Sequence, residues 1–270
     1  MLENPLMKPD FFIVFSLSRS GSSALFRALK AHSEISMVYE PQFGSANWNA
    51  DDVLEMLTEI RSNFEGIKHH WDPSGWPFGG THLSVIKDME AQFDKIFELN
   101  KLILTQPNQK VLFLRRRDEL ARLLSDQIGQ QTDIWTPAHP AFLKAEIATV
   151  TNEAKAFREK VTSKAIQSID MAIIQWYFDH VPDTENEFRA SIPNHQCMDL
   201  YYEDLFDPEQ DSAQRLKNYT CIIEFLGFSS DQSFWNAEEI DALFDPKGKL
   251  NNSSTINKIP NINQIRERFS

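Results

Sequence analysis

Cysteine is scarce in this sequence, because the 270-residue chain contains only Cys197 and Cys221. Two cysteines do not make a disulfide framework, and their separation does not match the ligand spacing of a metal site. We expect both to be small buried apolar side chains in a reducing compartment. The sequence thus predicts neither a disulfide scaffold nor a metal centre.

Long apolar runs are also missing. No stretch approaches the roughly 20 apolar residues that a membrane-spanning helix requires. The N-terminus, MLENPLMKPD, has neither the basic start nor the apolar core of a secretory signal. We therefore expect a cytoplasmic protein without a membrane span.

The chain has no excess of positive charge. Its formal net charge of -12 argues against a general nucleic-acid binder and against a docking surface for polyanions. A local basic pocket is compatible with this charge, and a phosphate site requires no more than that. Nucleic acid is therefore not an expected partner.

Length and composition indicate an ordinary globular protein. A chain of 270 residues, 41% apolar and 24% charged, is long enough for a full hydrophobic core. We expect one domain over residues 1–270. Within it, the aromatic, turn-rich residues 44–80 form either a lid or a packed surface loop, and residues 245–270 form either a flap over the site or a disordered end.

One stretch near the N-terminus predicts an anion site. The apolar run Phe11–Phe15 is typical of a buried strand, the residues from Ser16 to Ser23 are mostly small or polar, and a helix pattern begins at Ser22. The N–H groups of Gly21, Ser22 and Ser23 would point outward at the helix N-terminus, where the helix dipole favours an anion. The hydroxyls and Arg19 would complete the cradle, although an ordinary serine-capped helix explains the same pattern.

The loop is not a Walker A motif, because that motif requires a lysine where Ser22 stands. Further along the chain, apolar strands again alternate with helices. We expect strands at residues 35–39, 82–88, 111–114 and within 197–206, and helices at residues 51–64, 93–104, 119–131 and 212–226. This alternation predicts an α/β fold with a central parallel sheet flanked by helices, in a P-loop-like three-layer sandwich.

Polar residues follow two of the predicted strands. Glu40 ends the strand at residues 35–39, and three arginines at positions 115–117 end the strand at residues 111–114. Ligands of open α/β sheets bind at the carboxyl ends of the strands, so Glu40 and the phosphate loop would face the same mouth. A solvated Glu40, and surface arginines paired with neighbouring acids, are the alternatives.

These pieces resemble the sulfotransferases that use 3′-phosphoadenosine 5′-phosphosulfate (PAPS), especially the bacterial and Golgi-type carbohydrate sulfotransferases. SRSGSSAL resembles the loop that binds the 5′-phosphosulfate, which implies nucleotide-binding roles for its polar residues, namely Arg19, Ser20, Gly21, Ser22 and Ser23. RDELARLLS resembles the element that binds the 3′-phosphate, with Arg117 and Ser125 as its ligands. YEPQF resembles the segment that carries a catalytic glutamate, placed here at Glu40.

The chain departs from the cytosolic sulfotransferases at three points, one of which is the absence of their R-K-G tail motif. Ala24 stands where they have an adenine-stacking tryptophan, and the histidine of their K-T-H-L-P segment has no clear counterpart. Thr81-His82-Leu83 is similar, but His82 begins its predicted strand, and Lys87 lies at the strand end instead. The resemblance therefore implies Glu40 as the catalytic base, with His82 as the second candidate and Lys87 as a further candidate or helper.

The reaction implied by the resemblance is transfer of a sulfuryl group from PAPS to a hydroxyl or amine of a carbohydrate or small-molecule acceptor. The product nucleotide would be adenosine 3′,5′-bisphosphate (PAP). No metal is expected, because protein cations such as Arg19 would neutralise the charge. Two alternatives stay open: a P-loop kinase-like phosphotransferase that uses ATP and Mg²⁺, and a non-catalytic nucleotide-binding module.

Overall fold

The fold is built on a sheet of five parallel strands in the order β2-β3-β1-β4-β5. The structure is a computed structural model, and it describes residues 11–41, 49–71, 82–132, 159–244 and 253–269. The strands are β1 (Phe11–Ser16), β2 (Met37–Tyr39), β3 (Gly66–His70), β4 (Gln109–Arg115) and β5 (Cys197–Tyr201). The predicted parallel α/β sheet is thus confirmed.

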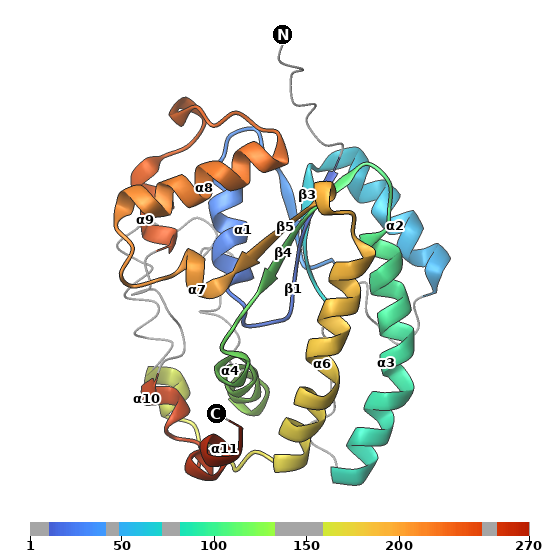
Figure 1. Cartoon of the computed structure of the whole chain (residues 1–270), viewed down its shortest axis with the longest axis vertical. Helices are drawn as coiled ribbons and strands as arrows, with labels where there is room; N and C mark the ends of the chain where they lie inside the picture. The colour runs from blue at the N-terminus through green and yellow to red at the C-terminus, as the bar shows by residue number, and fades with distance from the viewer. Residues whose placement is uncertain (1–10, 42–48, 72–81, 133–158, 245–252, 270) are drawn as a thin grey trace.

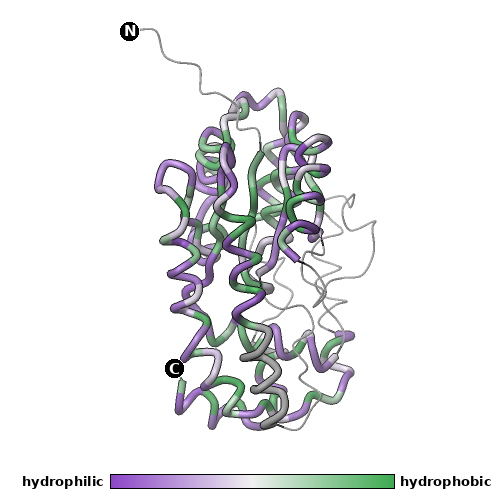
Figure 2. Tube along the Cα trace, turned by 90° about the vertical axis from the view of Figure 1, so that its right-hand side faces the viewer, coloured by the Kyte–Doolittle hydropathy of each residue, from purple (hydrophilic) through white to green (hydrophobic). Residues whose placement is uncertain are grey.

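Helices cover both faces of the sheet (Figure 1). One face carries α1 (Ser22–Lys30), α8 (Ser212–Leu226) and α9 (Ala237–Phe244), and the other carries α2 (Ala50–Asn63), α3 (His82–Leu104) and α6 (Met171–Ser191). The central strand β1 is buried throughout, with alternate residues packed in the two separate cores. Figure 2 shows apolar residues along the sheet between the helical layers. The predicted three-layer sandwich is therefore confirmed.

A smaller group of helices lies beyond the carboxyl ends of the strands (Figure 1). It contains α4 (Glu119–Thr132), α10 (Ser253–Ile256) and α11 (Ile262–Phe269), and the short α7 (Tyr202–Leu205) follows β5 directly. Ile259 and Ile265 are buried in the same core as Leu123 of α4. The described part of the C-terminal segment is thus packed as helices, while residues 245–252 lie outside the described residues.

Several predicted helices occur close to their expected bounds. Besides α1, α2 and α4, helix α8 begins after Asp211, whose side chain accepts a hydrogen bond from the Gln214 N–H at 2.8 Å. It ends at Gly227, which adopts the left-handed conformation with φ of 86°. These local signals were sufficient because capping depends on neighbouring residues alone.

The strand predicted at residues 82–88 is wrong, because these residues form the first turns of α3. Leu83, Ile86 and Phe93 recur at intervals of three or seven, so the helix pattern of residues 93–104 continues toward the N-terminus. His82 therefore does not begin a strand, and Lys87 does not end one. The ground on which Lys87 was a candidate for the base is therefore removed, while His82 lies at the start of a helix.

The strand that the prediction missed is β3, which lies between β2 and β1. Together with α2 it falls inside the segment proposed as a lid, so residues 50–63 and 66–70 of that segment belong to the body of the fold. The remaining parts, residues 44–48 and 72–80, lie outside the described residues. The lid stays a prediction for these parts alone.

Candidate functional site

The loop between β1 and α1 is tightly folded and requires its glycine. Gly21 has φ of 88°, and a Cβ atom at this position would lie 2.7 Å from Tyr202 Cδ2 and 2.8 Å from Phe206 Cε2. Arg19 is also left-handed, with φ of 63°. Ser20 is buried, and its Oγ has no hydrogen-bond partner among the residues that the structure describes. The loop thus presents the compact backbone that the sequence predicts for an anion cradle.

Three contacts fix this loop to helix α4. Arg19 Nε donates to Ser125 Oγ at 3.0 Å, and Ser18 Oγ donates to Asp126 Oδ1 at 2.5 Å. The Arg122 guanidinium donates to the Ser18 carbonyl at 3.1 Å. Because β1 leads toward β2 and β4 leads toward β5, this junction lies at the topological switch point of the sheet, where ligands of α/β proteins bind. Arg19 and Ser125 are therefore brought together, 106 residues apart in sequence.

Arg117 is held differently. Its guanidinium binds the Asp204 carboxylate through two hydrogen bonds of 2.5 and 2.7 Å, and about half of its side chain is exposed. Its backbone N–H and that of Asp118 both donate to the carboxylate of Glu203. The Arg117 guanidinium lowers the pKa of Asp204 through this hydrogen bonding. The acidic partner is thus Asp204, rather than one of the neighbouring acids considered from the sequence.

The other flank of the loop carries a cluster built on β2, β3 and α1. The buried Lys68 ammonium forms an ion pair with Glu40 Oε1, and His70 Nδ1 lies 3.1 Å from the same oxygen. His70 Nε2 lies 2.7 Å from Ser22 Oγ, and Lys68 Nζ donates to Ser23 Oγ at 3.4 Å. Glu40 is therefore linked to the first turn of α1 through two basic side chains.

The position of this cluster follows from strand register. Parallel pairing places His70 beside Ser16, the last residue of β1, so that β3 delivers its end to the start of the loop. Alternation along the strand then sends Lys68 and His70 to the face of α1, whereas His69 packs against Phe15 and contacts Asn100 on the other face. Tyr39 lies over Lys68, with the ammonium 3.9 Å from the ring centroid.

Burial and positive neighbours determine the protonation of His70. Burial lowers the pKa of His70 well below 6.5, and the charges of Lys68, His69, Arg19 and Arg122 lower it further. The imidazole is therefore neutral at pH 7, with one nitrogen as donor and the other as acceptor. A neutral ring can bridge Glu40 and Ser22 without adding a charge to the pocket.

Sequence reasoning missed Lys68 and His70. One position separates the two residues, as for side chains on the same face of a strand. The signal was available in the sequence GIKHH, but this stretch has one large apolar residue and was not recognised as a strand. Polar residues in a central strand are uncommon because each needs a partner when buried.

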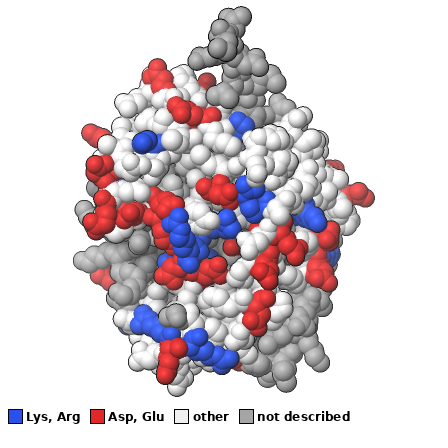
Figure 3. Space-filling view, in the orientation of Figure 1, with Lys and Arg blue, Asp and Glu red and all other residues white. Residues whose placement is uncertain are grey.

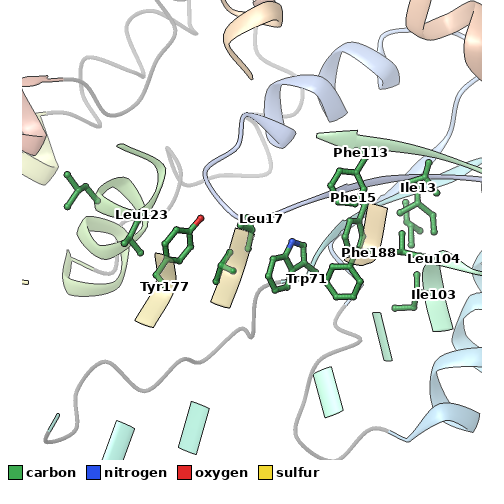
Figure 4. Packing of buried hydrophobic residues seen from close by; sticks show 14 of the residues in the cluster. Ile13, Phe15, Leu17, Trp71, Ile103, Leu104, Phe113, Leu123, Tyr177 and Phe188 are labelled. Atoms are coloured by element: carbon green, nitrogen blue, oxygen red, sulfur yellow. The ribbon is translucent and has the colours of Figure 1, made fainter. Parts of the chain in front are cut away.

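A buried acid lies behind the loop. Tyr177 and Trp71 flank Leu17 in the core (Figure 4), and Glu185 of α6 is buried nearby. Burial raises the pKa of Glu185 to about 7, and Glu119 adds to this rise, while Arg122 and Arg115 oppose it. Arg122 therefore interacts both with Glu185 and with the loop that carries Arg19.

Glu185→Gln should stabilise the fold most at high pH. Folding raises the pKa of Glu185 from 4.5 to about 7, so the folded state keeps the proton up to a higher pH than the unfolded state does. The free energy of unfolding of the wild type therefore falls as pH rises through this range. The variant should gain about 2–3 kcal/mol relative to wild type between pH 5 and pH 8. Thermal unfolding at both pH values measures this, with Glu187→Gln on the exposed side of α6 as the control. A stability difference that is the same at both pH values contradicts the expectation.

Basic and acidic side chains lie side by side across the middle of the face seen in Figure 3. The ion pairs of Arg115 with Asp199 and of Arg117 with Asp204 are examples of such neighbouring charges.

Cys197 is buried as expected, but the expectation for Cys221 is wrong, because it is exposed on α8. Its helix position faces solvent, away from the Ile222 and Ile223 side chains that enter the core.

No helix in the described ranges is long and apolar enough to cross a membrane. Among the same residues, no group of three or more histidine, cysteine, aspartate or glutamate side chains is arranged to hold a metal ion. Comparison with models of known protein families gave no match, and comparison with curated proteins gave none either.

Proposed function

We propose that this chain is a PAPS-dependent sulfotransferase, a nucleotide-binding transferase that acts on a hydroxyl or amine of a carbohydrate or small-molecule acceptor. One observation carries the proposal: a single small-residue loop contacts Ser125 through Arg19 on one flank and the Glu40–His70 pair through Ser22 on the other. A nucleotide cradle and a candidate base therefore share the same loop.

In this proposal the loop binds the 5′-phosphosulfate. The N–H groups at the start of α1 and the dipole of that helix attract the anion, and Ser20, Ser22 and Ser23 supply hydroxyls. Arg19 adds a guanidinium, which suits a phosphate because its planar fork donates two parallel hydrogen bonds. Ser125 would lie at the opposite, 3′ end of the nucleotide.

The transfer requires only PAPS and the acceptor as reactants. The acceptor oxygen or nitrogen attacks sulfur, the bond between sulfur and the bridging oxygen breaks, and its electron pair stays on the 5′-phosphate of PAP. Glu40 takes the acceptor proton. Because Lys68 and His70 both contact Oε1, we assign the proton to Oε2. Lys68, which reaches toward Ser23, stabilises the negative charge that develops on the leaving phosphate.

The kind of acceptor and the cellular location are parts of the proposal as well. Carbohydrates and apolar small molecules fit the aromatic character of residues 44–80 in the sequence. A cytoplasmic location agrees with two cysteines that are both free thiols. A screen of sulfate transfer across glycans, lipids and phenols would identify the acceptor.

Thermal unfolding with added nucleotides should separate this proposal from its alternatives. PAP at about 100 times its dissociation constant should stabilise the fold by about 2.7 kcal/mol, and ATP with or without Mg²⁺ should have a much smaller effect. A shift with ATP that requires Mg²⁺ would favour a kinase-like phosphotransferase. A PAP shift without sulfate transfer to any acceptor in the screen would favour a non-catalytic module.

A further inference from the structure

Arg122 of α4 is a buried cation that the proposed chemistry does not use. Its residue is 4% exposed, and its guanidinium lies over the Tyr177 ring of α6, with the central carbon 4.7 Å from the ring centroid. Nε donates to the Tyr177 hydroxyl at 3.2 Å, and a terminal nitrogen donates to the Ser18 carbonyl at 3.1 Å. Arg122 therefore joins helix α6 to the loop between β1 and α1.

The Ser18 carbonyl is a position where a contact can orient the loop. It belongs to the same planar peptide unit as the Arg19 N–H, and Arg19 has the left-handed φ of 63°, which is costly for a residue with a side chain. The carbonyl binds Arg122, while the Ser18 hydroxyl binds Asp126. Both contacts come from α4, so this helix fixes the peptide unit that leads into Arg19.

Glu185 of α6 interacts with the same guanidinium. Burial raises the pKa of Glu185 to about 7, and the charge of Arg122 is the largest influence that opposes burial. Glu119 of α4 raises this pKa further, whereas Arg115 of β4 and the Trp71 indole lower it. Helix α3 packs against α6 as well, through aromatic rings that carry no charge. Arg122 is thus the main positive partner of an acid that can lose its proton near neutral pH.

The loop and the buried acids share one positive charge. Burial also raises the pKa of Glu119, so two carboxyl groups lie near Arg122, and ionising both in a buried place is costly. When Glu185 is neutral, the charge of Arg122 contributes to the positive potential at the loop. When Glu185 is ionised, its negative charge offsets that contribution. A bound anion and an ionised Glu185 therefore compete for the same guanidinium.

We propose that Arg122 is a positioning residue of the loop, and that protonation of Glu185 regulates nucleotide binding through Arg122. The inference rests on the proposed function, because it requires an anionic nucleotide at this loop. The nucleotide binds more tightly when Glu185 is neutral, and by linkage the bound nucleotide makes Glu185 take up a proton. Nucleotide affinity consequently falls as pH rises through neutrality.

Isothermal titration with PAP at pH 6 and pH 8 tests the role of Glu185. Glu185→Gln imitates the neutral acid at both pH values, and the titration of the PAP phosphates is common to both proteins. The ratio of wild-type to variant affinity should fall about fivefold from pH 6 to pH 8, which corresponds to a coupling of about one pKa unit, the size for charges roughly 10 Å apart at an effective dielectric constant of about 20.

Proton uptake gives a second measurement of the same coupling. At pH 7 the wild type should take up about 0.4 proton more per PAP than Glu185→Gln, for the same coupling of about one pKa unit. The difference appears as a dependence of the binding heat on the ionisation enthalpy of the buffer. Glu185→Met, which is also neutral, answers the question if the glutamine variant does not fold.

A matched variant controls for charge on α6. Glu187→Gln makes the same change on the exposed side of this helix, where solvent and salt screen the charge. The ratio of wild-type to Glu187→Gln affinity should be the same at pH 6 and pH 8. A fivefold fall with this variant too would show a general effect of charge and overturn the role of Glu185.

Tyr177→Phe tests the positioning role of Arg122. It keeps the ring but removes the hydroxyl to which Arg122 Nε donates. PAP affinity at pH 6 should fall about three- to tenfold, the scale of one lost hydrogen bond to a charged group. A hydroxyl with a merely structural role would lower the unfolding temperature and leave the affinity of the folded protein unchanged.

The outcomes separate this inference from the proposed function. If wild type binds PAP at neither pH, the proposed function fails, and the regulation fails with it. If wild type binds PAP but its affinity ratio to Glu185→Gln is the same at both pH values, only the regulatory role of Glu185 is overturned. Unchanged PAP affinity in Tyr177→Phe overturns the positioning role of Arg122.

Discussion

Glu40→Gln is expected to lower sulfate transfer by about 10²- to 10⁴-fold, the range found when a general base is lost. The amide is nearly isosteric with the carboxylate, but it cannot accept the acceptor proton. Glu40 directly follows β2 with a left-handed backbone, φ of 44°, and its side chain is 38% exposed. An acceptor can therefore reach Glu40 while Lys68 and His70 hold it from behind. The measurement is PAP formation with the acceptor that the screen identifies.

Binding and a matched variant distinguish a base from a structural residue. PAP affinity should stay within about threefold of wild type, because Glu40 acts on the acceptor and not on the nucleotide. Glu34→Gln makes the same change on an exposed turn before β2, and its transfer rate should equal that of wild type. Turnover by Glu40→Gln at the wild-type rate would exclude Glu40 from the reaction, and His70 would become the remaining candidate.

The sequence was informative where structure depends on neighbouring residues. The apolar run of β1, the small residues after it and the start of α1 are contiguous, so strand, loop and helix could be predicted together. The rule that ligands bind at the carboxyl ends of parallel strands also predicted that Glu40 would face the same mouth as the loop. The structure places Glu40 beside the loop, because His70 contacts both Glu40 and Ser22.

The sequence was uninformative where burial depends on distant partners. Lys68 can be fully buried in β3 because its ammonium binds Glu40 and Ser23. His69 can be buried because its ring forms a hydrogen bond with the Asn100 side chain. No pattern inside GIKHH shows these partners, so the strand looked like a polar loop. The sequence does not show side-chain direction either, since Arg117 binds Asp204 after β4 whereas Arg116 lies over the Tyr202 ring.

Lys68→Met is expected to lower sulfate transfer by about 10²- to 10³-fold, the loss typical when a donor that stabilises developing charge is removed. The ammonium lies between Glu40 and Ser23, and its side chain has no exposed surface. Methionine keeps the length and the packing of the side chain but removes the charge. The rate is measured as for Glu40, and nucleotide affinity is measured in parallel.

The unfolding temperature of the Lys68 variants distinguishes a catalytic role of the ammonium from a structural one. Removing one partner of a buried ion pair is costly when the other charge stays buried, but Glu40 is 38% exposed and can be hydrated after Lys68 is lost. Lys68→Met, and Lys68→Met combined with Glu40→Gln, should therefore unfold at the wild-type temperature or above. Lys110→Met, at the amino end of β4, controls for the loss of a strand lysine and should keep full transfer. A Lys68 variant that unfolds early but retains its transfer rate would identify the ammonium as structural.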